Sequence, residues 1–182
     1  STTSIKTLLD YFEISILYFN PNIPPKEEYN KRYNELKKFV ELVKKENPNS
    51  KIEIIETRYE PQEYFDFVKG LENETEGGKR CEKCFELRLS ETAKIAKQLK
   101  FDYFTTTLTV SPYKNSQIIN KIGKELSEKF DIKYLFSDFK KNDGYKKSIL
   151  YSKQYDLYRQ DYCGCIYSVK ERDEYLKNKN SD

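Results

Sequence analysis

Two pairs of cysteines are the residues in this sequence whose type and spacing point most directly to chemistry. Cys81 and Cys84 form a C-x-x-C pair in "KRCEKCFELRL", and Cys163 and Cys165 form a C-x-C pair in "YRQDYCGCIYS". These are the four cysteines of the chain, which has no histidine. A metal site would therefore use sulfur, oxygen or water, and histidine acid–base chemistry is excluded.

The C-x-x-C pair is predicted to open a helix running from about Cys81 to Leu99. Free backbone N–H groups, the helix dipole and the neighbouring Lys79 and Arg80 favour the thiolate form. Thiol–disulfide exchange, a zinc half-site and an iron–sulfur half-site all use this spacing, and two incidental cysteines are a further interpretation.

The C-x-C pair surrounds Gly164, whose missing side chain lets the backbone approach a ligand closely. In an extended segment both sulfurs point the same way, which suits joint coordination. A buried pair or a strained disulfide is the alternative. Together the four cysteines are compatible with a tetrahedral all-cysteine site for zinc or a 4Fe-4S cluster.

Two further segments carry polar groups suited to a nucleic acid. The segment "TTTLTVSPYKN" (105–115) clusters hydroxyls with Lys114, which suits phosphate or ribose as well as an ordinary turn. Arg159 lies beside Tyr158, Gln160 and Tyr162, which combines a cation with aromatic faces for a stacked base. A surface arginine over an aromatic core is the equal alternative.

Composition predicts a single globular domain over residues 1–182, with a charged helical tail over about 166–182. Hydrophobic residues make up 37%, charged residues 35% and aromatic residues 15%. The net charge of +3 does not by itself indicate a nucleic-acid partner. The sequence has no long apolar run and no secretory signal, so we expect no membrane span and a cytoplasmic location.

Helical and strand patterns alternate along the chain. Helices are expected over 1–12, 26–45, 61–70, 81–99, the segment after "SPYKN", 143–154 and 166–180, and strands over 14–19, 51–56, 101–108 and 132–136. This order predicts an α/β fold with a mainly parallel sheet. The ligand site then lies where the loops "NPNIPP", "TRYEP", "TLTVSPYKN" and "SDFKKNDG" leave the carboxyl ends of the strands.

Four segments together resemble the QueH-type epoxyqueuosine reductases: "YFNPNIPPKEEYNKR", "KRCEKCFELRLSETAKIA", "FTTTLTVSPYKN" and "YRQDYCGCIYS". The resemblance implies a Rossmann-like three-layer fold and an oxidoreductase of queuosine biosynthesis in tRNA processing. Such an enzyme reduces epoxyqueuosine at the anticodon wobble position of tRNA to queuosine. It implies a 4Fe-4S cluster with an adjacent iron ion, and a low-potential electron donor.

The resemblance also implies roles for individual residues. Cys81 and Cys84 match the family's C-x-x-C and are the strongest metal-ligand candidates, whereas Cys163 and Cys165 match its C-G-C, with cluster ligation and a redox or structural role both open. Candidate tRNA or substrate contacts are Arg80, Thr107, Ser111, Arg159 and Gln160. An RNA-binding module with a structural four-cysteine zinc site is the runner-up function, and a thiol–disulfide oxidoreductase is the third.

The N-terminus departs from the family pattern. Family members begin with an apolar strand that ends in adjacent cysteines, whereas this chain begins at Ser1 with a predicted helix and contains no methionine. We therefore expect the sheet to lack its first strand and the metallocentre to lack ligands. The full-length parent is expected to be the enzyme, and this 182-residue chain to be catalytically impaired or inactive.

Overall fold

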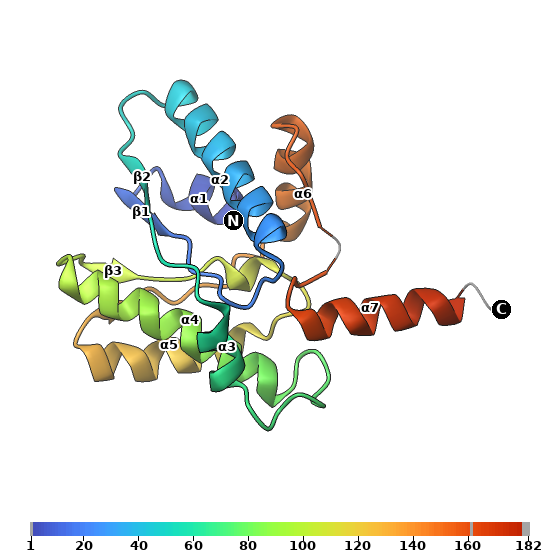
Figure 1. Cartoon of the computed structure of the whole chain (residues 1–182). Helices are drawn as coiled ribbons and strands as arrows, with labels where there is room; N and C mark the ends of the chain where they lie inside the picture. The colour runs from blue at the N-terminus through green and yellow to red at the C-terminus, as the bar shows by residue number, and fades with distance from the viewer. Residues whose placement is uncertain (1, 161, 180–182) are drawn as a thin grey trace.

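A computed structural model describes residues 2–160 and 162–179, and in it helices and short strands alternate along the chain (Figure 1). Its elements are α1 (Thr2–Leu8), β1 (Ile14–Leu17), α2 (Lys26–Glu46), β2 (Ile52–Ile55), α3 (Pro61–Phe67), α4 (Lys79–Gln98), β3 (Tyr103–Phe104), a 3-10 turn η1 (Leu108–Val110), α5 (Ser116–Phe130), β4 (Lys133–Tyr134), α6 (Gly144–Gln154) and α7 (Ile166–Lys179). The end of the predicted tail, 180–182, lies outside the described residues.

The α/β class and the parallel pairing agree with the sequence prediction, but the strands are short. In the described part, β1 pairs with β2 over Ile14–Leu17, and β3 pairs with β4 over two residues, so the parallel strands form two separate pairs. The strand expected over 101–108 is limited to Tyr103–Phe104. Its continuation uses side-chain bonds instead: the Thr105 hydroxyl donates to the carbonyl of Leu135 at 2.9 Å.

Each strand pair has its own hydrophobic core. Around β1 and β2 the core takes buried residues from α1 and α2, including Val40 and Val43. Around β3 and β4 it takes residues from α4 and α5, including Leu89 and Ile119. Figure 1 shows α1, α2 and α6 gathered around the first pair, and α4 and α5 beside β3. This arrangement leaves an interface between the two cores in which a cleft forms.

The loops after the strands are tied to one another by hydrogen bonds. The Thr57 hydroxyl, after β2, donates to the carbonyl of Tyr18, after β1, at 2.8 Å. The Lys140 ammonium, after β4, donates to the carbonyl of Lys114, after η1, at 2.7 Å. Because both strand pairs are parallel, the four loops predicted to form the ligand site lie at carboxyl ends of strands.

Helix α7 projects away from the rest of the chain in Figure 1. None of the helices in the described ranges combines the length and apolar character needed to cross a bilayer.

Candidate functional site

The structure brings the two cysteine pairs together. The first turns of α4 present Cys81 and Cys84, and the loop between α6 and α7 presents Cys163 and Cys165; all four line a small cavity of about 20 Å³. All four are free thiols, Cys84 and Cys165 being buried. Within residues 2–160 and 162–179, however, no group of three or more cysteine or carboxylate side chains is arranged to hold a metal ion.

The C-x-x-C thiols differ electrostatically from the sequence expectation, which favoured thiolates. Burial raises the pKa of the Cys84 thiol to about 12. Burial also raises the pKa of Cys81, although the backbone N–H of Gly77 donates to its sulfur at 3.2 Å. Desolvation therefore outweighs the helix terminus and the neighbouring cations in setting the pKa of both thiols.

Within the C-x-C pair, the pKa values of the two thiols shift in opposite directions. A hydrogen bond from the Cys165 thiol, and then the charges of Lys114, Arg88 and Arg32, hold the pKa of Cys163 well below its usual range. The same hydrogen bond raises the pKa of Cys165. The Lys114 ammonium lies 3.8 Å from the Cys163 sulfur. Cys163 is therefore the sulfur best disposed to carry negative charge in this cavity.

Arg32 of α2 fixes the backbone of the C-x-C loop. Its Nη1 donates to the carbonyl of Cys163 at 3.0 Å, and its Nε donates to Glu28 at 2.7 Å. Gly164 has a φ of +107°, and a Cβ at that position would lie 2.6 Å from Nη1 of Arg32. The glycine is required for both its backbone conformation and this close approach.

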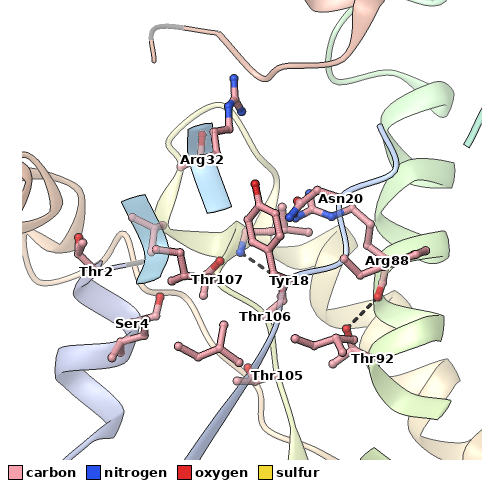
Figure 2. Close-up of a pocket in the computed structure, with 18 of the residues that line it drawn as sticks. Thr2, Ser4, Tyr18, Asn20, Arg32, Arg88, Thr92, Thr105, Thr106 and Thr107 are labelled. Atoms are coloured by element: carbon pink, nitrogen blue, oxygen red, sulfur yellow. Dashed lines mark hydrogen bonds between the residues drawn. The ribbon is translucent and has the colours of Figure 1, made fainter. Parts of the chain in front are cut away.

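A large open cleft lies beside the sulfur cavity and between the two cores. Its volume is about 1,220 Å³, and Cys163 lines both the cleft and the small cavity. Four of the five predicted substrate contacts line the cleft, namely Thr107, Ser111, Arg159 and Gln160. Figure 2 shows hydroxyl side chains of Thr105, Thr106 and Thr107 along one wall, with Tyr18 and Asn20 nearby.

The aromatic neighbours of Arg159 are different from those that the sequence suggested. Its guanidinium lies 5.4 Å from the ring centre of Tyr145, and its Nη1 donates to the Ser148 hydroxyl at 3.4 Å. Tyr158 is instead covered by the ammonium of Lys31, 3.5 Å from its ring centre. Arg159 is exposed at the rim of the cleft, where a ligand can reach it.

Arg80 is the predicted contact that does not line the cleft. It is 1% exposed, and Nη1 donates to the backbone carbonyls of Glu72 and Glu74. Nη2 pairs with Glu171 at 3.0 Å, and the guanidinium covers the ring of Tyr167 at 4.4 Å. These contacts give Arg80 a packing role, in which it joins the loop before α4 to α7.

Sequence reasoning did not single out Arg32 or Arg88 as site residues. Arg88 follows Cys81 and Cys84 at helical spacing, so all three lie on one face of α4, and that signal was present in the sequence. Arg32 had no such signal, because it reaches the C-x-C loop only through the packing of α2 against a segment far along the chain.

Comparison with known proteins places this chain in a family. The family model described as "Epoxyqueuosine reductase QueH" matches residues 1–171. A protein of that name from Streptococcus pyogenes serotype M1 is 45% identical over 93% of this chain and 66% of its own length. The namesakes from Staphylococcus epidermidis and Thermotoga maritima are 41% and 35% identical, over 77% and 86% of their lengths. The chain belongs to the QueH family of epoxyqueuosine reductases.

Proposed function

We propose that this chain carries the active-site scaffold of a reductase that converts epoxyqueuosine at the wobble position of tRNA into queuosine. The reaction consumes two electrons and two protons, breaks both C–O bonds of the epoxide, forms a ring double bond and releases the oxygen as water. The observation that carries the proposal is the convergence of four cysteines on a cavity beside a large cleft, in a chain of this family.

The donor set fits an iron–sulfur group in part. Soft thiolate sulfur is the ligand that iron–sulfur clusters use, and the N–H of Gly77 already points at the sulfur of Cys81. We propose that Cys81 and Cys84 hold part of a 4Fe-4S cluster with an adjacent iron ion. Further ligands for this group are part of the proposal, as the family resemblance implies. When bound, such a group supplies single electrons and Lewis acidity.

The cleft residues are proposed to bind the RNA. Thr107 and Ser111 offer hydroxyls to ribose or phosphate, Arg159 offers a cation at the rim, and Gln160 offers an amide that can donate and accept. An external low-potential electron donor completes the proposal by family resemblance, and a cytoplasmic location is proposed from the sequence. A Rossmann-like three-layer arrangement is proposed for the fold, supported by the parallel pairing of both strand pairs.

The test is anaerobic reconstitution with iron and sulfide, followed by incubation with tRNA that carries epoxyqueuosine and a low-potential donor. Nucleosides from the digested tRNA are measured by mass spectrometry. Cys81→Ser and Cys84→Ser are expected to lose bound iron and turnover. Cys163→Ser separates the two roles left open for the C-x-C pair, because a cluster ligand loses iron on replacement, whereas a redox or structural residue loses turnover alone.

Metal analysis of the same protein decides between the proposal and its rivals. Zinc without iron or sulfide, bound by all four cysteines, would favour the RNA-binding module, for which the shared cavity is the supporting observation. A reversible dithiol couple without metal would favour the thiol–disulfide oxidoreductase. The Staphylococcus epidermidis relative serves as the positive control, and comparison with it tests the expectation that the present chain is impaired.

A further inference from the structure

In the described part of the chain, two cations between the sulfur cavity and the open cleft have no carboxylate partner. Arg88 of α4 and Lys114 of the loop after η1 line both hollows. In the part of the chain that the structure describes, neither forms an ion pair with a carboxylate, whereas Arg58 pairs with two carboxylates and Arg80 with one. Their positive charge is therefore available to an anion that enters the cleft.

Arg88 is held in place by a neutral side chain, and Lys114 lies on a braced loop with its ammonium 3.8 Å from the sulfur of Cys163. Nη2 of Arg88 donates to the side-chain oxygen of Asn20 at 2.6 Å, and Asn20 is itself buried. The loop that carries Lys114 is held by the bond from Lys140 to its carbonyl. It is also held by Asn115, whose side chain caps α5. A cation whose position is already fixed loses little conformational freedom when a ligand binds.

A third donor faces the same cleft. Arg32 lines the cleft, and its side chain is only 10% exposed. Nε and Nη1 are occupied by Glu28 and by the carbonyl of Cys163, but Nη2 is buried and has no hydrogen-bond partner. Buried donors are rarely left unpaired unless a ligand or water uses them. Figure 2 shows Arg32 and Arg88 bordering the pocket from two different helices.

We propose that Arg88 and Lys114, with Nη2 of Arg32 as a third donor, bind a backbone phosphate of the substrate RNA. The proposal rests on the proposed function and names the contact that places the reacting nucleotide beside the sulfur cavity. Guanidinium groups suit phosphate because their paired N–H donors match its oxygens. The cleft, at about 1,220 Å³, exceeds the roughly 300–1,000 Å³ of ordinary small-molecule pockets, so it has room for a nucleotide with its flanking phosphate.

Salt dependence of RNA binding tests the proposal. Affinity for an anticodon stem-loop RNA is measured between about 50 and 200 mM salt for the wild type, Arg88→Gln and Lys114→Gln. Each phosphate contact that is lost is expected to flatten the plot of log affinity against log salt by about 0.7–0.9. Arg88→Lys and Lys114→Arg are expected to keep the slope. Lys51→Gln is the matched control, because Lys51 is exposed, pairs with Glu13 and lines neither hollow.

A wild-type salt slope in both glutamine variants would overturn the proposal. This holds even if the variants bound less iron, because the two cations would then stabilise the sulfur site and would not contact the RNA. If Arg88→Gln does not fold, Lys114→Gln decides the matter alone. The proposed function fails in a different way: the wild type would bind the stem-loop with the expected slopes, but after anaerobic reconstitution it would hold no iron or sulfide.

Discussion

Replacing Gly164 by alanine is expected to disturb the C-x-C loop through Arg32 and not only through backbone strain. The new Cβ would lie 2.6 Å from Nη1 and 2.8 Å from Nη2 of Arg32. The guanidinium must then leave its place and give up its bond to the carbonyl of Cys163. A hydrogen bond to a charged group contributes about 1.5–3 kcal/mol, and a residue held at unfavourable φ costs about 1–3 kcal/mol. The summed loss is about 2.5–6 kcal/mol.

Gly70→Ala is the matched control for this substitution. Gly70 has a φ of +84°, and a Cβ there would meet nothing within 4 Å, so the variant reports the backbone strain alone. Urea denaturation measures both variants, and Gly164→Ala is expected to lose about 1.5–3 kcal/mol more than Gly70→Ala. Rates of alkylation at each cysteine, followed by mass spectrometry, are expected to rise at Cys163 and Cys165 relative to Cys84.

A double-mutant cycle isolates the contact. In an Arg32→Ala background the space beside Gly164 is open, so Gly164→Ala is expected to cost no more than Gly70→Ala does in the wild type. Equal losses from Gly164→Ala in the wild-type and Arg32→Ala backgrounds would refute the reasoning. The same conclusion would follow if Gly164→Ala and Gly70→Ala lowered the free energy of unfolding equally in the wild-type protein.

Three other substitutions test the roles of particular side chains. Arg80→Gln is expected to lower the free energy of unfolding by about 2–4 kcal/mol, because it removes a buried guanidinium that donates to two backbone carbonyls and to Glu171, and to keep the wild-type salt slope of RNA binding; a flatter slope would show a phosphate contact. The hydrogen bond from Lys6 lowers the pKa of Glu46 in the folded protein. The stabilisation that this bond gives is therefore present at pH values above the pKa of Glu46 in the unfolded chain, and it is lost as the pH falls through the lower pKa of the folded protein. The stability difference between the wild type and Glu46→Gln, measured by urea denaturation, is therefore expected to shrink as pH falls below about 4.3, and a constant difference would contradict this. Asn115→Ala is expected to cost about 1 kcal/mol through loss of the α5 cap, measured in the same way; an unchanged midpoint would show that the cap is dispensable.

Helices could be predicted from the sequence to within a few residues, because their signals are local. Periodic apolar residues define α2, and a capping asparagine with the breakers before it defines the start of α5. The strand over 101–108 was predicted too long because threonines favour strands by type. In the structure, the hydroxyls of Thr105 and Thr109 form hydrogen bonds with the loop after β4. These bonds depend on a segment that is distant in the sequence, which local patterns do not reveal.

The candidate site divides in the same way between local and long-range signals. The cysteine pairs are visible as residue types at short spacing, and the hydroxyl-rich segment after β3 lies in the cleft as the loop rule for parallel sheets predicts. The sign of the thiol pKa shifts was not predictable, because helix position favours thiolate whereas burial opposes it, and burial is a property of the folded chain. Arg80 shows the same limit, since its motif position suggests a ligand and its burial gives it a packing role.

In helix α4, the local sequence pattern and the long-range packing of the chain position the same residues. Phe85, Leu89 and Ala93 pack into the core around β3 and β4, while Cys84 lines the sulfur cavity and Arg88 lines both hollows. Because a rotation of the helix would move both sets together, the packing that buries the apolar side also determines where the sulfurs and the cation lie. The C-x-C loop is held instead by contacts from several segments. Arg32 of α2 donates to the carbonyl of Cys163, the backbone N–H of Cys163 donates to the hydroxyl of Ser168 at 3.2 Å, and Cys165 packs with Tyr64 of α3. The two halves of the sulfur cavity are therefore supported differently, one by the packing of a single helix and the other by contacts between segments that are far apart in the sequence.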